Sequence, residues 1–166
     1  MSSASGAAAA QIIVRKAPPD FTDWEPVRAL ILDAFAYMEA RINPPSSALR
    51  LTAKSMNANA DKGGLFLAER GADLVGCVFA QVKGDVLYIG KLAVRPGLQG
   101  SGIGKKLVDA TREEARRRSI GILELETRIE LVENHATFAR MGFVKTGESA
   151  HEGFDRPTSI TMRAKI

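Results

Sequence analysis

The chain has 166 residues, with 23 Lys and Arg against 19 Asp and Glu, which leaves a net charge of +4. Its length suits one domain of ordinary size, and its 45% hydrophobic and 25% charged residues exclude a disordered or fibrous chain. One cysteine excludes a disulfide framework, and two histidines are too few for a histidine-rich metal cage, so we expect no metal site. A pI near 9.4 favours an anionic ligand but does not require nucleic acid.

The first ten residues differ in composition from the rest of the chain. After Met1 they are only Ser, Ala and Gly, without the basic start and leucine-rich core of a secretory signal. We therefore expect residues 1–10 to form a disordered tail, followed by a single domain at residues 11–166. No apolar run approaches the length of a membrane span, so the sequence predicts a cytoplasmic protein with no membrane segment.

The first third of the chain is expected to contain one strand and two helices. Residues 11–15 predict a short strand. Thr22 and Glu25 have the spacing of a capping box, which satisfies free N–H groups at a helix start, and apolar residues follow at helical spacing. Residues 43–45, Asn-Pro-Pro, end this helix because proline lacks an N–H, and residues 47–59 predict a second, weaker helix.

The centre of the chain predicts an antiparallel meander followed by a helical crossover. Strands are expected at residues 65–69, 73–82 and 85–94, separated by short links that contain glycine. A helix at residues 102–118, with Gly121 as the glycine that follows it, leads to a strand at residues 122–127. Because a crossover of this length joins parallel strands, strands 85–94 and 122–127 are expected to be parallel.

The end of the chain predicts a helix at residues 134–141 and strands at residues 143–148 and 158–164. Most of the other consecutive strands can pair antiparallel. The sequence therefore predicts an α+β fold, with a mixed, mostly antiparallel sheet flanked by helices.

The loop before the helix at residues 102–118 contains Gly100, Gly102 and Gly104, followed by Lys105 and Lys106. A helix start has free N–H groups and a partial positive charge, which suit phosphate, and glycines let an anion approach the backbone closely. Lysines in a first turn suit a docked polyanion, although they could instead point to solvent. The spacing fits neither the P-loop nor the dinucleotide-binding fingerprint.

The sequence Gln99-Gly-Ser-Gly-Ile-Gly104 resembles the Q/R-x-x-G-x-G/A motif of the GNAT N-acetyltransferase superfamily. The expected order of elements over residues 11–166 is similar to that family's fold. Asn134, Phe138 and the pair Gly142-Phe143 resemble its second conserved segment. The resemblance implies that the fourth and fifth strands are parallel and splayed around acetyl-CoA, the co-substrate, with no metal.

The resemblance also implies which residues bind acetyl-CoA. The fourth strand would pair with the pantetheine amides, the glycine loop would hold the pyrophosphate, and Asn134 would contact the pantetheine or position the thioester. The implied cofactor-binding residues are Leu92, Ala93, Val94, Gln99, Gly100, Ser101, Gly102, Ile103, Gly104, Lys105, Asn134 and Phe138. Asn134 could instead be the N-cap of its own helix. Phe138 departs from the family pattern, because many members have a tyrosine there whose hydroxyl protonates the leaving thiolate, so a slower or water-assisted departure is implied.

Acetylation of an amine also needs a group that takes a proton from the ammonium. Glu124 and Glu126 share one face of a strand, and Glu126 is nearer the strand end; both could also face solvent. His135 and His151 are further candidates, with a surface position as the alternative for each. Tyr88 could supply the missing hydroxyl from another direction, with half-buried packing as the alternative.

In this family the first two helices and the last hairpin usually select the acceptor. The corresponding residues are Phe35, Tyr37, Met38, Arg41, His151 and Arg156. The two arginines could face a carboxylate, which hints at an amino acid or an acidic metabolite, whereas the aromatic and methionine side chains could be core packing. Cys77, in the middle of a strand, predicts apolar packing.

The leading hypothesis is an acetyl-CoA-dependent N-acetyltransferase that acts on a primary amine of a small metabolite or peptide by direct attack. The alternative, which Phe138 keeps open, is a catalytically weak CoA-binding sensor or regulatory module. Nucleic-acid binding has little support, because the chain lacks a strand platform of aromatic and basic residues. A homodimer is plausible for this family, but the sequence does not decide it.

Overall fold

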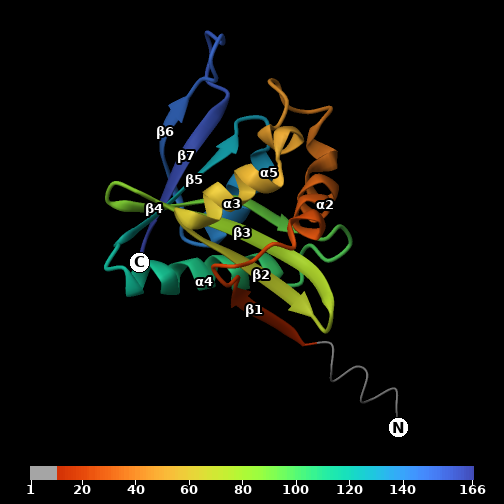
Figure 1. Cartoon of the computed structure of the whole chain (residues 1–166). Coiled ribbons are helices and arrows are strands. Elements are labelled where there is room, and N and C mark those ends of the chain that lie inside the picture. Colours follow the sequence, from red (N-terminus) through yellow and green to blue (C-terminus); the bar gives the residue numbers. More distant parts are fainter. Residues whose placement is uncertain (1–10) are drawn as a thin grey trace.

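Seven strands of the protein form one mixed sheet in the order β1-β2-β3-β4-β5-β7-β6 (Figure 1). The structure, a computed structural model, describes residues 11–166, so the tail expected at residues 1–10 lies outside it. The strands are β1 (Ile12–Lys16), β2 (Gly63–Arg70), β3 (Asp73–Lys83), β4 (Val86–Val94), β5 (Ile122–Arg128), β6 (Val144–Ser149) and β7 (Ser159–Lys165). Each predicted strand is confirmed to within two residues.

Helices cover both faces of the sheet. They are α2 (Trp24–Phe35), η1 (Ala36–Met38), η2 (Ser47–Arg50), α3 (Ala53–Asp61), α4 (Ile103–Arg117) and α5 (Val132–Arg140). Helices α2 and α3 pack on one face of β2–β4, and α4 packs on the other (Figure 1). None of the helices between residues 11 and 166 is both long and apolar enough to cross a membrane.

Alternation along the strands separates two buried clusters. In β2, Leu65 and Leu67 pack with α2 and α3, whereas Phe66 and Ala68 pack on the α4 side. On that side, a Cβ added at Gly76 would lie 2.9 Å from the Ile103 side chain. The start of α4 is therefore held tightly against the sheet, which fixes the position of the glycine loop before it.

Strands β4 and β5 are parallel, as predicted, and they soon separate. Only Leu87 and Tyr88 of β4 pair with β5, opposite Leu123 and Glu124, although β4 continues to Val94. The two halves of the sheet diverge from this point (Figure 1). The pairing of β3 with β4 shifts register in the same region, and Lys91 has a positive φ of 53°. This irregularity is a β-bulge, a feature that turns a side chain away from the regular alternation.

Two local predictions about helix ends are wrong. Asp23 is the N-cap of α2 and makes no side-chain cap, because the Thr22 carbonyl instead accepts a bond from the Trp24 N–H in a tight turn. Helix α4 ends before Gly121: Ser119 takes the left-handed conformation (φ 58°), and the Ile120 N–H closes the end on the Ala115 carbonyl.

Two further predictions are corrected at α5 and between residues 47 and 61. Asn134 is inside α5, whose N-cap is Leu131, so its alternative role as an N-cap is excluded. The weak helix expected at residues 47–59 is divided into η2 and α3, because Thr52 and Ser55 form a capping box that starts a new helix at Ala53.

Candidate active site

The glycine loop presents the uncapped N-terminus of α4. Gly102, the N-cap, lies in the left-handed region (φ 88°), and Gly100 has a φ of 83°, a conformation that favours glycine. Gly102 provides no side-chain acceptor, and the first turn of α4 contains no acidic residue. The first backbone N–H groups of this helix therefore remain available for an anion.

Two polar side chains of the loop hold its shape. The Gln99 amide accepts a bond from the Gly97 N–H at 3.0 Å and donates to the Val94 carbonyl at 3.2 Å. The Ser101 hydroxyl donates to the Leu98 carbonyl. Gln99 therefore ties the loop to the end of β4, and Ser101 closes a turn within the loop.

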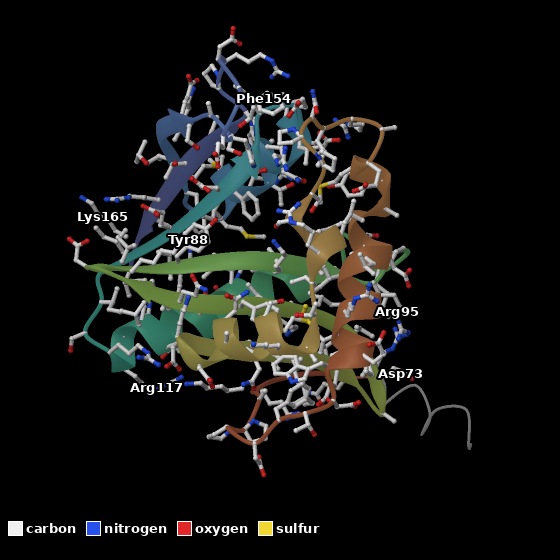
Figure 2. All side chains as sticks on the ribbon, turned by 45° about the horizontal axis from the view of Figure 1, so that its top comes forward. Asp73, Tyr88, Arg95, Arg117, Phe154 and Lys165 are labelled. Carbon is white, nitrogen blue, oxygen red and sulfur yellow. The ribbon has the colours of Figure 1, made fainter. Side chains whose placement is uncertain are left out.

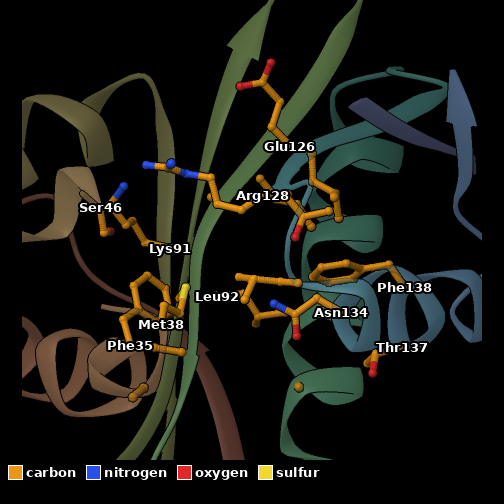
Figure 3. A pocket seen from close by; sticks show the side chains of 18 of the residues that line it. Phe35, Met38, Ser46, Lys91, Leu92, Glu126, Arg128, Asn134, Thr137 and Phe138 are labelled. Carbon is orange, nitrogen blue, oxygen red and sulfur yellow. The ribbon is translucent and has the colours of Figure 1, made fainter. Parts of the chain in front are cut away.

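A cavity of about 980 Å³ extends from this loop along β4 to η1 and η2. Its walls come from α2, η1, η2, β4, β5 and α5, so it occupies the wedge where β4 and β5 separate (Figure 3). Most of the predicted cofactor-binding residues line it: Leu92, Ala93, Val94, Gln99, Gly100, Gly102, Ile103, Gly104, Lys105, Asn134 and Phe138. Ser101 lies outside the lining.

The predicted catalytic residues have different surroundings. Tyr88 and Glu126 line the cavity next to each other, whereas Glu124 is ion-paired with Arg163 of β7 at 2.8 Å. Burial, and then the charges of Glu126 and Glu124, raise the pKa of Tyr88 to about 12. The structure does not bring His135 into the lining, and its ring is held by the Arg128 carbonyl at 2.9 Å.

Some of the predicted acceptor-binding residues reach the cavity and others do not. Phe35, Tyr37 and His151 line it, as does Met38. Arg41 is ion-paired with Glu133 of α5 and lies outside the lining.

Arg156 also lies outside the lining and stacks on the ring of Phe154, 5.5 Å from its centroid. Phe154 lies at the far tip of the connection between β6 and β7, away from Tyr88 (Figure 2). Neither of the two arginines predicted to face an acceptor carboxylate is therefore placed to do so.

Two cations that the sequence reasoning did not single out do point into the cavity. Lys91 comes from the bulge of β4 and Arg128 from the end of β5, and both reach toward the segment around Ser46 (Figure 3). Burial lowers the pKa of Lys91, and the charges of Arg128 and Arg50 lower it further. Arg128 was detectable from sequence, because it lies two residues after Glu126 and so shares its face of the strand.

Helix α5 places Asn134 and Phe138 one turn apart on the cavity wall (Figure 3). Asn134 Nδ2 donates to the Tyr37 hydroxyl oxygen at 3.3 Å, which links α5 to η1. Phe138 packs edge-on against Phe143, with ring centroids 5.9 Å apart. Phe138 is thus part of the core that supports α5 as well as part of the cavity wall.

Cys77 is fully buried, and burial raises the pKa of its thiol to about 12. It is therefore a thiol at neutral pH and packs with the α2 side of the core, in agreement with the sequence prediction. Over residues 11–166, no three His, Cys, Asp or Glu side chains gather in a way that could hold a metal ion.

Comparisons with known proteins give the family. The sequence model of the acetyltransferase (GNAT) family matches residues 24–143. The IAA acetyltransferase of Azospirillum brasilense is 29% identical over 102 residues, which are 60% of this chain and 66% of that protein. The match thus spans slightly less than two thirds of that relative.

Solved structures share the fold. The PaiA N-acetyltransferase of Thermoplasma acidophilum in complex with coenzyme A superposes with a TM-score of 0.76 at 14% identity, over 94% of this chain and 99% of that one. The IAA acetyltransferase of Bacillus cereus ATCC 14579 has a TM-score of 0.67 at 20% identity, over 94% and 100% of the two chains. The chain belongs to the acetyltransferase (GNAT) family, a family of acyltransferases.

Proposed function

We propose that this protein is an acetyl-CoA-dependent N-acetyltransferase. The observation that carries the proposal is the wedge between β4 and β5, which opens beside the uncapped N-terminus of α4. Among residues 11–166, no strand pairs with the β5-facing backbone of β4 after Tyr88, and a pantetheine chain can pair with such an edge as an added strand does. The relative bound to coenzyme A shares this fold, which supports the proposal.

The residues present fit the parts of acetyl-CoA. Leu92, Ala93 and Val94 would pair with the pantetheine, and the first N–H groups of α4 would receive the pyrophosphate. Asn134 and Phe138 would flank the thioester end from α5. Lys105 already pairs with Asp109 at 2.9 Å, so its charge is partly neutralised before any phosphate arrives.

The bound co-substrate would supply a thioester whose carbonyl carbon accepts the amine. In the reaction a C–N bond forms and the C–S bond breaks. The nitrogen loses one proton before attack and a second one after it; the CoA thiolate gains one proton, and the other leaves to solvent. The site therefore needs two kinds of protein group: a base on the amine side and an acid on the thiolate side.

We assign the base to Glu126. Tyr88 is unsuited to this role, because its raised pKa keeps it protonated at neutral pH. Glu124 is held by Arg163, whereas the Glu126 carboxylate lines the cavity without an ion pair among the described residues. Tyr88, next to Glu126, would keep that carboxylate oriented.

We assign the acid to Tyr37, since Phe138 has no proton to give. The Tyr37 oxygen accepts a bond from Asn134, which leaves the hydroxyl proton free to donate into the cavity. This hydroxyl comes from η1, on the opposite side of the wedge from α5. The role that a tyrosine on α5 has in many relatives would thus be taken by a residue from another element.

The first test combines cofactor binding with turnover. If the Kd for acetyl-CoA is about 1 μM, a concentration of about 100 μM stabilises the fold by about 2.7 kcal/mol. For a chain of this size the melting temperature should rise by roughly 5–11 °C with acetyl-CoA and not with NAD or ATP. Thiol release with a panel of amines should then be detectable, and Glu126→Gln should lower kcat by about 10²–10⁴.

Either half of this test can contradict the proposal. No thermal shift at millimolar acetyl-CoA would refute the assignment of the loop. A shift without thiol release from any amine would favour the alternative, a CoA-binding sensor or regulatory module. A cytoplasmic location belongs to the proposal as well, because the only cysteine is a buried free thiol.

A further inference from the structure

The end of the cavity away from the glycine loop is lined by three cations, Arg50, Lys91 and Arg128. Lys91 Nζ donates to the Ser47 hydroxyl at 2.6 Å. Over residues 11–166, none of the three has a carboxylate within ion-pair distance. These side chains come from three separate elements, so the fold itself brings their charges together.

Lys91 and Arg128 lie close enough to repel each other. Burial is the largest cause of the lowered pKa of Lys91, and the charge of Arg128 is the next. Within the described part of the chain, the Arg128 guanidinium donates only to neutral acceptors, the carbonyls of Pro44 at 2.7 Å and Pro45 at 3.0 Å. Two partly buried cations side by side, without an anion between them, form a site that an anionic group would stabilise.

The nearby carboxylates do not neutralise this pair. Glu130 and Glu39 favour the charged form of Arg128, but neither forms an ion pair with it. Glu126 and Glu152 line the cavity, against five cationic side chains in the same lining: Arg50, Lys91, Lys105, Arg128 and Arg140. The lining is therefore positive overall. Its positive charge near η2 is separate from the glycine loop, which is the part proposed to bind the pyrophosphate.

We propose that Lys91 and Arg128 bind a carboxylate of the acetyl acceptor, so that the acceptor is an amine with a carboxylate a few bonds away, as in an α-amino acid. This inference rests on the proposed function. Glu126 and Arg128 are two residues apart on one face of β5, with Cα atoms about 7 Å from each other. The amine of such a ligand lies at Glu126 while its carboxylate reaches Arg128 and Lys91.

The apolar part of the acceptor has a place on the same wall. Met38, Ile42 and Leu131 form a small buried cluster with Phe35, and all four line the cavity. Amino acids with apolar side chains are therefore the first acceptors to test.

The experiment compares each amino acid with its own α-amide, using acetyl-CoA and the full chain and measuring thiol release. The amide keeps the amine and the side chain and lacks the negative charge of the acid, so it also imitates the N-terminus of a peptide. Amines without any carboxylate, such as phenethylamine, complete each series. We expect kcat/KM to be higher for the acids than for their amides by about 10-fold or more, the usual effect of hydrogen bonds to a charged group.

Two variants test the assigned cations. Lys91→Gln and Arg128→Gln should each raise KM for the acid by about 10-fold or more and leave KM for the matching amide within about 2-fold. Lys54→Gln is the matched control, because Lys54 is an exposed lysine of α3 outside the cavity lining, and it should change neither value. A purely structural role, through Ser47 or the two proline carbonyls, would instead raise KM for acid and amide alike.

Each outcome decides the matter. Acids preferred over amides, with the preference lost in the two variants, would support the inference. Amides or simple amines acetylated as well as the acids would overturn it and leave the proposed function standing. A thermal shift with acetyl-CoA but no acetylation of any amine would overturn the proposed function, and this inference with it.

Discussion

Helix α4 carries the proposed phosphate site at one end and is anchored at the other by the buried carboxylate of Glu114, 5% exposed. Burial raises the pKa of Glu114, but hydrogen bonds from Arg117, Arg118 and Lys16 outweigh it and lower the pKa from 4.5 to about 2. A carboxyl pKa that is roughly 2.5 lower in the folded protein than in the unfolded chain corresponds to about 3 kcal/mol of unfolding free energy. Glu114→Gln should therefore destabilise the protein by about 3 kcal/mol at pH 7 and lower the melting temperature by roughly 6–12 °C.

The dependence on pH has a definite sign. Because the pKa of Glu114 is depressed in the folded state, its contribution is complete above the ordinary value of 4.5 and is lost as the pH falls toward 2. Urea unfolding at a series of pH values should show that the difference in unfolding free energy between wild type and Glu114→Gln falls to about 1.5 kcal/mol at pH 3.

Glu113→Gln is the control for this experiment. Glu113 pairs with Arg116 on the exposed side of the same helix, so its substitution should cost less than about 1 kcal/mol. Two results would refute the reasoning. One is a loss of unfolding free energy for Glu114→Gln that is no larger at pH 7 than the loss for Glu113→Gln, and the other is a loss that does not change with pH.

Three other predictions concern the glycine loop, Cys77 and His151. Gly102→Ala and Gly71→Ala both place an alanine at positive φ and should each cost about 1–2 kcal/mol, but only Gly102→Ala should weaken acetyl-CoA binding, measured by calorimetry. The raised pKa of Cys77, about 12, predicts no iodoacetamide labelling of the native protein at pH 8 and full labelling in urea, read by mass spectrometry. Burial, and then the charge of Arg128, lower the pKa of the His151 imidazole from its ordinary value of 6.5. As the pH falls, the imidazole therefore takes up a proton more readily in the unfolded chain than in the folded one. Below pH 6.5 the wild type should lose more stability than His151→Gln. The His151 prediction would be contradicted if wild type and His151→Gln lost stability equally in acid. The Cys77 prediction would be contradicted by labelling of the native protein, and the Gly102 prediction by unchanged acetyl-CoA binding in Gly102→Ala.

The order of elements was predictable because local chemistry specifies it. The turns at Gly71 and Gly84 have positive φ values, 62° and 58°, so glycine in the sequence marks the meander directly. Helix ends were less predictable, because competing caps lie close together. At the start of α2 the Thr22 carbonyl, rather than its hydroxyl, accepts the first bond, and at the end of α4 Ser119 takes the left-handed position two residues before Gly121.

The open, left-handed backbone of the glycine loop was predictable, because that conformation favours glycine. The roles within the loop were not all predictable. Gln99 fits the family motif, yet its amide is bound to Gly97 and Val94, which makes it a support for the loop. Such a role depends on the direction of one side chain, and the spacing of residues in the motif does not contain that direction.

The cations near the cavity show which features of the proposed acceptor site the sequence could not predict. Arg41 and Arg156 lie in segments that the family resemblance implies for acceptor selection, but Glu133 and the Phe154 ring engage them outside the cavity. Lys91 reaches the cavity because the bulge in β4 turns it with a φ of 53°, and no alternation along the strand predicts such a turn. Strand alternation places Arg128 on the face of Glu126, but the carbonyls that hold its guanidinium come from residues 44 and 45, more than eighty positions earlier. A charge acquires a binding role in this fold from the partners that tertiary contacts give it or withhold, and the acid–amide comparison measures that role directly.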